Sequence, residues 1–517
     1  MVSARTLEIL VGAGVAPEAL FALATPPQDL ASVQWVHTLA GPELGRFALA
    51  TPERVAKMMS AGPTPLANIS QDRFEGLLLE ECRRRGIQVD FKSRWASMEE
   101  KGGGVLSRIR DASGGEKELR SRFVFACDGA ASPVRKFLRI GMEGPEKIQT
   151  FINIFFRADL RPLVAERPGI LYWHVDPEDS GVFIAHDIDS TWVYMHPYDA
   201  TRHGREDFDE EKCRGLLQRV IGAPVDFEVR EINAWTMTAQ TALHYRQGDA
   251  FLVGDAAHRF PPTGGLGMNT GIADAANLAW KVAAVADGRA APGLLDTYET
   301  ERRPVAVANA RASLDNWRKM PQVHQALDYS HESDPDAARE RIRSLAADPP
   351  RERAVEHAIA QQAEHFDSTG LDLGYVYEGG ALSADEAPHL APGGGASDYV
   401  PSTRPGARLP HAWVERNGER TSTLWLADPR CPVLLVGTEG EAWRRAAQGL
   451  DLEVLAIGEG GDVQDPQGEW AALREVSESG AILLRPDGHV AWRAAHSVPE
   501  PLVDLGAALR QMMASGV

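Results

Sequence analysis

One segment of this 517-residue chain restricts its fold more than any other, the run FLVGDAAHRFPPTGGLGMNTGIADAANLAWK from Phe251 to Lys281. It starts as a short apolar strand, Phe251–Val253, passes through a turn rich in proline and glycine, and is predicted to become a helix from about Met268. A glycine-rich loop before a helix is common in α/β proteins, but this composite is long and specific. It predicts an α/β domain with a ligand site at the turn.

The groups in this turn match the needs of a flavin. Its glycines carry no side chains, so backbone amides can approach a ligand closely; they are Gly264, Gly265 and Gly267. The helix start adds unpaired N–H groups and a positive dipole end. We expect the Asp255 carboxylate to bind ribityl hydroxyls, and the amides of Gly267–Asn269 to bind the pyrimidine carbonyl and N1.

Phe251–Lys281, followed by Leu294–Glu299 and Glu301–Pro304, resembles the FAD-contacting end of the single-component flavoprotein aromatic hydroxylases. These are the FAD-dependent monooxygenases similar to p-hydroxybenzoate hydroxylase. A second block, Phe123–Arg135, resembles the family's strand and DG motif, although a strand ending in a DG turn is a weak pattern alone. The resemblance implies that the following residues contact FAD: Asp128, Gly254, Asp255, Pro262, Gly265, Gly267, Met268 and Asn269.

The family's usual opening is a strand, a GxGxxG loop and a helix for the ADP half of FAD. Val11–Pro17 contains two of the glycines, but Ser3–Leu10 has helical spacing, and a proline, Pro17, stands at the sixth position of the loop. We therefore predict a helix that ends at Gly12 or Gly14, followed by a turn.

The segment Ser3–Leu10 resembles the part of the family that follows this opening unit. By that resemblance Arg5 lies near the FAD phosphates, while a solvated helix arginine fits the pattern equally well. The chain is thus expected to lack the first GxGxxG unit. Two explanations compete: a start codon placed too far downstream, which we favour, and a shortened protein with weak or no FAD binding.

The bulk composition narrows the choice of partners. The net charge is −19, from 54 basic and 73 acidic residues without a basic stripe, which argues against nucleic acid or an anionic membrane. No apolar run approaches the roughly 20 residues of a bilayer span, and the start shows no secretory pattern. The four cysteines are far apart, so we expect no metal site, no disulfide and a cytoplasmic protein.

The segments before the DG block complete the first part of the predicted FAD-binding domain. Ser70 is a candidate N-cap of a helix. Gln71 resembles a family glutamine that reaches the ribityl and phosphate region, and a solvent-facing glutamine fits equally well. Strands are predicted over Gln88–Arg110 and Glu118–Cys127 around a glycine turn.

Residues 150–245 change character. Short strand-like runs predict an antiparallel sheet, inserted between the two parts of the nucleotide-binding domain, which by resemblance is the substrate domain. Trp235, Trp173 and Met195 are favoured for packing against a planar substrate, although each alone is more often ordinary sheet core. A histidine would suit the deprotonation of a phenol. The sequence leaves three candidates open: His174, His186 and His196.

The last part of the chain predicts a separate domain. Pro, Gly and Ser gather in Ala391–Pro405, which indicates a linker. Beyond it, short strands alternate with a helix. The pattern resembles the thioredoxin-like C-terminal domain of the larger aromatic and polyketide hydroxylases. It has no CxxC, so a dimerising or structural role is expected.

The predicted architecture is α/β, with an N-terminally truncated, Rossmann-like FAD-binding domain in two parts, residues 1–149 and 246–390, the second including a helical connection. The antiparallel substrate domain, 150–245, is inserted between them, and the thioredoxin-like domain occupies 391–517. The resemblance implies an FAD- and NAD(P)H-dependent monooxygenase that hydroxylates a phenolic or polycyclic, polyketide-like aromatic with O2 through a flavin C4a-hydroperoxide, and it allows a homodimer. The alternatives are a flavin oxidase, dehydrogenase or Baeyer–Villiger-type enzyme on the same scaffold, and a truncated, non-catalytic remnant.

Overall fold

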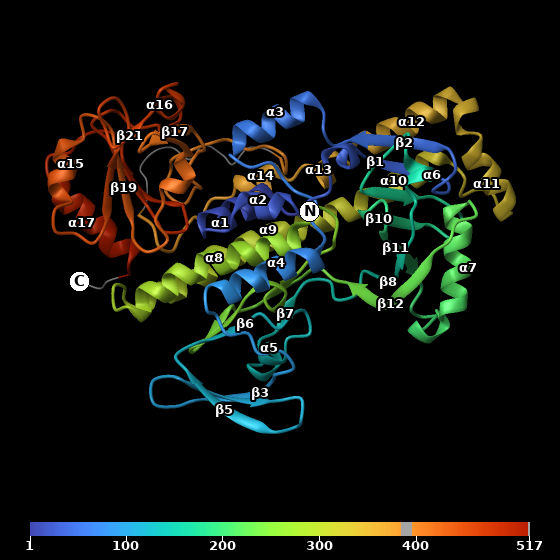
Figure 1. Ribbon diagram of the computed structural model, residues 1–517, viewed down its shortest axis with the longest axis horizontal. Helices are drawn as coiled ribbons and strands as arrows, with labels where there is room; N and C mark the ends of the chain where they lie inside the picture. The colour runs from blue at the N-terminus through green and yellow to red at the C-terminus, as the bar shows by residue number, and fades with distance from the viewer. Residues whose placement is uncertain (384–394, 515–517) are drawn as a thin grey trace.

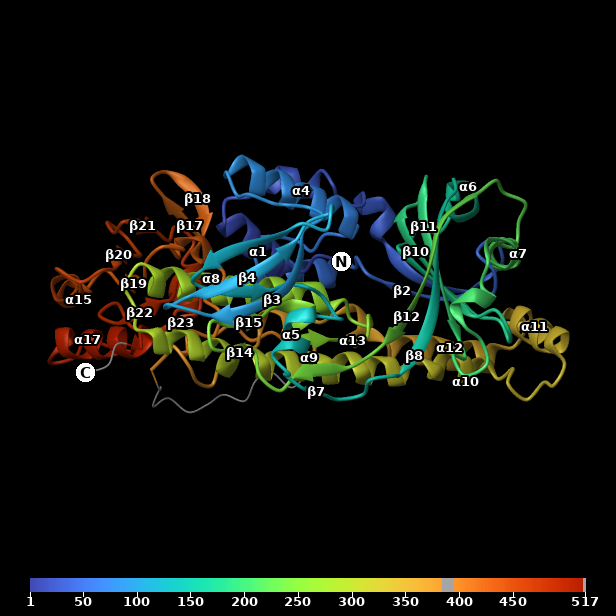
Figure 2. The same cartoon turned by 90° about the horizontal axis from the view of Figure 1, so that it is seen from below.

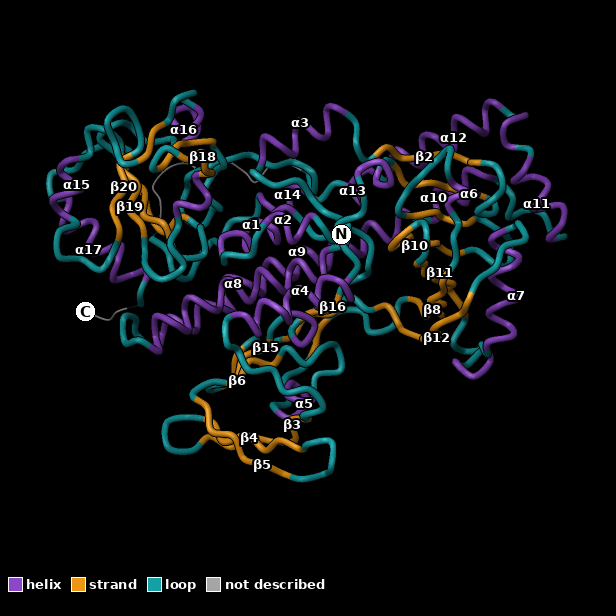
Figure 3. The backbone as a smooth tube through the Cα atoms, in the orientation of Figure 1, coloured by secondary structure: helices purple, strands orange, loops and turns teal. Residues whose placement is uncertain are grey.

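Two long helices form the axis of the molecule. The computed structural model describes residues 1–383 and 395–514. In Figure 1, α8 (Leu266–Ala286) and α9 (Thr297–Lys319) run side by side through its middle. The C-terminal domain lies at one end of this pair and a large sheet at the other, as the strand-rich regions of Figure 3 show. In the described ranges, no helix is long and apolar enough to cross a membrane.

A small sheet beside α8 positions the two motifs that stand out in the sequence. Its order is β14-β15-β6, in which β15 (Ala250–Leu252) runs parallel to β6 (Val124–Ala126) and antiparallel to β14 (Arg246–Gln247). All three residues of β15 are buried, as its apolar run predicts. Because β6 and β15 are parallel, the segments that follow them emerge at the same edge of the sheet.

The large sheet carries the predicted substrate domain, and its order is β12-β8-β11-β10-β9-β1-β2. Five strands come from the predicted region and pair antiparallel: β8 (Gln149–Arg157), β9 (Leu171–His174), β10 (Gly181–Asp187), β11 (Thr191–Tyr198) and β12 (Glu228–Met237).

The sheet extends beyond the predicted range, which corrects the expectation for residues 1–149. β1 (Ser32–Val36) and β2 (Glu43–Ala48) join its edge, with β1 parallel to β9. The sheet is therefore mixed rather than purely antiparallel. The sequence pattern missed both strands, and the partner that joins them to the sheet, β9, is far from β1 along the chain.

Different helices cover the two faces of this sheet. Side chains alternate along each strand, and the face that includes Phe183 and Tyr194 packs against α7 (Glu210–Ile221). Figures 1 and 2 both show α7 on the side of the sheet away from α8. At the β1 end of the opposite face, apolar side chains pack against α10 (Pro321–Leu327) and α12 (Pro349–Ala360).

The N-terminal segment forms the helix that its spacing predicts. α1 spans Ala4–Gly12, and the Ser3 side chain caps it by accepting a hydrogen bond from the Thr6 amide. Gly14 then adopts a left-handed conformation with φ of 84°, which ends the helical path. Val11–Pro17 is thus a helix end and a turn rather than a dinucleotide loop.

The predictions around the DG block are partly wrong. α4 (Gln71–Arg84) does begin after Ser70. However, β3 (Arg94–Glu100), β4 (Val105–Arg110) and β5 (Glu116–Ser121) form an antiparallel meander that leaves out residues 88–93. The predicted strand over 118–127 is divided, because the chain passes from the meander at β5 into the small sheet at β6.

The C-terminal domain contains a four-stranded sheet of order β20-β19-β22-β23. β19 (Val433–Val436) pairs parallel with β20 (Glu453–Ala456) and antiparallel with β22 (Ala481–Leu484), which also pairs with β23 (Val490–Ala494). α15 (Glu441–Ala446) connects the parallel pair, and α17 (Pro501–Met512) follows β23. This arrangement suits the thioredoxin-like fold. The predicted boundary at residue 391 lies outside the described residues.

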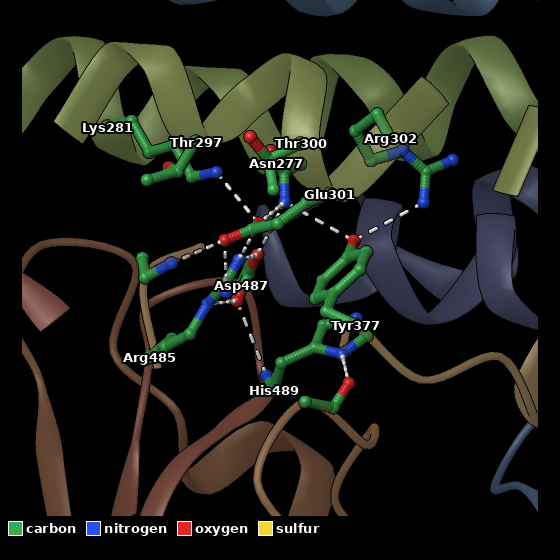
Figure 4. Close-up of polar contacts among 12 residues, drawn as sticks. Asn277, Lys281, Thr297, Thr300, Glu301, Arg302, Tyr377, Arg485, Asp487 and His489 are labelled. Carbon is green, nitrogen blue, oxygen red and sulfur yellow. Dashed lines mark hydrogen bonds and ion pairs between the residues drawn. The ribbon is translucent and has the colours of Figure 1, made fainter. Parts of the chain in front are cut away.

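Buried charges join this domain to the helix pair (Figure 4). The Glu301 carboxylate of α9 accepts hydrogen bonds from both terminal nitrogens of Arg485, at 2.9 and 2.8 Å, and from Lys281 Nζ of α8 at 2.7 Å. Asp487 accepts two further bonds from Arg485, and Asn277 Nδ2 donates to Glu301 at 2.6 Å. The Arg485–Asp487 turn therefore contacts both long helices.

Candidate active site

The ends of β6 and β15 bring the two predicted acidic residues to one edge of the small sheet. Ala126 is the register partner of Leu252, and the Val253 amide donates to the Ala126 carbonyl at 3.1 Å. Asp128 and Asp255 follow directly, and both are exposed. One Asp128 oxygen accepts a hydrogen bond from the Val134 amide at 3.0 Å, which caps the short helix α5 (Pro133–Phe137).

The Gly254 turn meets α8 backbone to backbone. Gly254 has φ of 60°, a left-handed conformation that favours glycine. A Cβ placed on Gly271 of α8 would lie only 3.1 Å from the Gly254 Cα. Two glycines are thus needed for this close approach, which sets Asp255 beside the first turns of α8.

The start of α8 faces open space. Gly265 is the N-cap, with φ of 65°, and a Cβ built on Gly265 or Gly267 would meet no atom within 4 Å. Pro262 is exposed, and Met268 is half-buried. The N–H groups of Leu266, Gly267 and Met268 have no acceptor within the helix. A planar ring that accepts hydrogen bonds fits this position, as the flavin prediction requires.

The Asn269 side chain is used within the protein, whereas the flavin prediction concerns its backbone amide. Its Nδ2 donates to the carbonyls of Met1, at 3.1 Å, and Gly265, at 2.7 Å, while its Oδ1 accepts from the Ser3 amide and the Thr6 hydroxyl. The side chain therefore holds the glycine turn and the N-terminal segment together. Contact of the Asn269 backbone amide with FAD stays a prediction.

A buried aspartate that sequence reasoning missed anchors the Gly254 turn. Asp274 Oδ2 lies 2.7 Å from His258 Nε2 and accepts from the Gly254 amide at 3.3 Å, while Oδ1 accepts from Arg302 Nε at 2.7 Å. Burial raises the pKa of Asp274, but the opposing effects of His258 and Arg302 are larger and lower it overall. His258 is fully buried, so its ring belongs to the interior of the protein.

Arg135 is a second missed residue, and it joins the two motif loops. Its guanidinium donates to the carbonyl of Ala256, after β15, at 2.6 Å and to that of Ala130, after β6, at 2.8 Å. Arg135 is buried, so these bonds are shielded from water. The only sequence signal was its place at the end of the DG block, in a short helix after a proline.

Two predicted FAD contacts are used elsewhere in the protein. Arg5 is buried, which excludes the solvated alternative, and its Nη2 donates to the Asp487 carbonyl of the C-terminal domain at 2.8 Å. Its Nη1 lies 3.5 Å from Glu8. Gln71 is exposed, and its Nε2 donates to Glu75 at 2.7 Å. Contact of either with FAD stays a prediction.

The three predicted substrate residues come together on one face of the large sheet. Met195, Trp173 and Trp235 belong to one apolar cluster. The Trp235 ring stacks on Phe151, with centroids 5.1 Å apart, and its Nε1 donates to Asn153 Oδ1 at 3.0 Å. This face is opposite the one that α7 covers, because Met195 alternates with the α7-facing residues of β11.

Comparison with known families and proteins gives a consistent result. Residues 1–313 match the family described as FAD binding domain, and residues 402–515 match the family described as Aromatic-ring hydroxylase, C-terminal. The 2,4-dichlorophenol 6-monooxygenase of Delftia acidovorans is 32% identical over 98% of this chain and 90% of its own length. The tetracenomycin A2 monooxygenase-dioxygenase of Streptomyces glaucescens is 33% identical over 86% and 75%.

Solved structures with the same fold include two flavin-dependent enzymes. The flavin-dependent monooxygenase PieE, in complex with FAD and substrate, has a TM-score of 0.93 and 35% identity, covering 100% of this chain and 92% of that one. Aklavinone-11 hydroxylase, with FAD and aklavinone, has a TM-score of 0.81 and 30% identity over 99% and 91%. These names are those of oxygenases, so they do not favour an oxidase or a non-catalytic remnant.

Proposed function

The chain belongs to the family of FAD-dependent aromatic-ring hydroxylases, and from this premise we propose that it hydroxylates a phenolic or polycyclic aromatic compound with O2 and NAD(P)H. The observation that supports the proposal most is the meeting of two acidic strand ends, Asp128 and Asp255, with the glycine-lined start of α8. The phenolic class is that of the dichlorophenol relative, and the polycyclic class is that of the aklavinone enzyme.

FAD, when bound, supplies the redox and oxygen-transfer chemistry, and the residues of this chain bind and orient it. In our proposal Asp255 accepts hydrogen bonds from the ribityl hydroxyls. The N–H groups of Gly267 and Met268, with the positive end of α8, stabilise negative charge on the pyrimidine side of the ring. Pro262 stiffens the loop beside the ring. Trp235, Trp173 and Met195 hold the aromatic substrate by packing.

The proposal is tested with the purified full-length chain and its Asp255→Ala variant. With FAD present, the wild type is expected to show flavin absorbance and NAD(P)H oxidation stimulated by 2,4-dichlorophenol, with one atom of labelled O2 in the product. Asp255→Ala should weaken FAD binding about tenfold or more, because a charged acceptor is removed. Asp504→Ala, at an exposed position of α17, is the matched control. A wild type without flavin absorbance at saturating FAD would overturn the proposal.

Three further expectations belong to the proposal and rest on the sequence: a homodimer, a cytoplasmic location and the domain boundaries. Light scattering during size-exclusion chromatography measures the assembly directly. A mass of one chain at micromolar concentration would exclude the dimer.

A further inference from the structure

The middle of the substrate face is only half covered. Phe155, Ile184 and Val193 lie on this face and are half-buried. On the α7 side, their strand neighbours Phe156 and Phe183 are fully buried. Apolar side chains left half-open in the middle of a sheet, beside the cluster of Trp235 and Met195, suit a planar aromatic ligand.

His186 lies on this half-covered face. It occupies the irregular position between Ala185 and Asp187, where β10 departs from regular pairing with β11. Such irregularities re-aim a side chain. The imidazole is half-buried, and its ring centroid is 6.4 Å from that of Phe155.

The other two candidate histidines lie on the opposite face of the sheet, where their rings contact other groups of the protein. His174 is buried, with its Nδ1 3.0 Å from the Tyr194 hydroxyl, and burial lowers its pKa to about 4. His196 Nδ1 lies 3.0 Å from the Ser180 carbonyl, and its ring stacks beside Tyr194. Tyr194 belongs to the core beneath α7, so neither imidazole faces the substrate side.

His186 also lies near the first turn of α4. Arg73 Nη2 of this helix donates to Asp187 Oδ2, on the residue after His186, at 3.1 Å. Asp72 precedes Arg73 in the same turn.

We propose that His186 is the catalytic base that accepts the proton of the substrate's phenolic hydroxyl. This inference rests on the proposed function. The O–H bond of the phenol breaks and an N–H bond forms on the ring, which leaves a phenolate and an imidazolium in place of two neutral groups. The electron pair kept by the oxygen enriches the aromatic ring, which is the partner that oxygen transfer needs. When the product is released, the proton returns to the phenolate oxygen.

The charges around His186 suit this role. Burial lowers the pKa of His186, Asp72 acts against this effect and Arg73 acts with it, so that the net direction is down. The ring is therefore neutral at pH 7 and able to accept a proton. Asp72 stands at the first turn of α4, and as a carboxylate it stabilises the imidazolium once formed.

The test uses the FAD-loaded full chain, the His186→Gln variant and 4-nitrophenol as a probe whose ionised form absorbs visible light. In the wild type, the bound probe is expected to ionise at least one pH unit lower than in His186→Gln. With 2,4-dichlorophenol, kcat of His186→Gln should fall at least tenfold at pH 7 and recover as the pH rises. FAD affinity should be unchanged. His196→Gln is the matched control and should behave as the wild type.

The outcomes distinguish the role of His186 as a base from the proposed hydroxylase function. Equal ionisation of the bound probe in wild type and His186→Gln, or a deficit independent of pH, overturns the role of His186 and leaves the hydroxylase function in place. Normal ionisation in the wild type without any hydroxylated product overturns the proposed function, while the proton-accepting role stands.

Discussion

Three donors share the carboxylate of Asp274: His258, Arg302 and the Gly254 amide. Arg302 neutralises a charge that would otherwise be costly inside the protein, and His258 donates a hydrogen bond to it. The third fixes the strand end on α8. Sequence patterns pointed to Asp128, Asp255 and the glycines at the start of α8, because an acidic residue after a strand and a glycine-rich turn before a helix are both typical of a ligand site. They could not predict Asp274, because its three partners are 16, 20 and 28 residues away and only the folded structure brings them together.

At single positions, the clearest prediction concerns Gly267. Its Cβ would meet no protein atom within 4 Å, so Gly267→Ala should leave the apoprotein as stable or stabilise it by about 0.5–1 kcal/mol through helix propensity. The same methyl group would enter the space assigned to the flavin. We therefore expect FAD affinity to fall about tenfold or more, measured by titration of flavin fluorescence, while the melting temperature of the apoprotein does not fall.

The matched control is Gly215→Ala in α7, where a Cβ would meet only the end of the Arg219 side chain, at 3.6 Å. It should give a similar gain in stability with no change in FAD affinity. Equal FAD affinity in Gly267→Ala and the wild type would show that the flavin ring does not lie against this turn.

At the scale of elements, Arg135 ties the ends of β6 and β15 through two carbonyls. A lysine ammonium cannot reproduce this planar, two-branched contact. Arg135→Lys should therefore lower the free energy of unfolding by about 1–3 kcal/mol and weaken FAD binding several-fold, because the two acidic strand ends separate. Denaturant unfolding and FAD titration measure the two effects. Lys136→Met, a change at an exposed neighbouring position in α5, should alter neither stability nor FAD binding. If Arg135→Lys lowered stability but left FAD affinity unchanged, the positioning role of Arg135 would be contradicted.

Elements with strong local signals were predictable. α1, α4 and α8 have helical spacing and identifiable caps, and each forms where the sequence indicates. The strands β1 and β2 were missed, and no local pattern encodes the pairing of β1 with β9, which lies far along the chain. The same reason explains why Trp235, Trp173 and Met195 could be named but not placed on one face.

For the whole molecule, the Arg485–Asp487 turn makes the C-terminal domain part of the flavin domain's core. Glu301 is its centre: burial raises the pKa of Glu301, but Arg485 and Lys281 outweigh this effect and lower it to about 2. Glu301 and both cations are fully buried. Without the Glu301 carboxylate, the buried cations Arg485 and Lys281 lose an anionic partner that balances their charge. Glu301→Gln should therefore destabilise the protein by about 3–5 kcal/mol.

Lys281 gives the complementary prediction, with a distinctive pH dependence. Burial lowers the pKa of Lys281 to about 8, from its ordinary value of 10.5, with Glu301 acting in the opposite direction. Between pH 8 and 10.5 the unfolded chain therefore binds more protons than the folded one, and this group adds stability as the pH rises, about 3 kcal/mol in total. Lys281→Met removes that contribution, while Glu301 keeps both bonds to Arg485. From pH 8 to pH 10, the unfolding free energy of the wild type should thus rise relative to that of Lys281→Met. The difference between the wild type and Lys101→Met, a change at an exposed site, should stay constant over the same range. A constant difference over this range would mean that Lys281 stays protonated, and that the contact between the domains is a permanent ionic one.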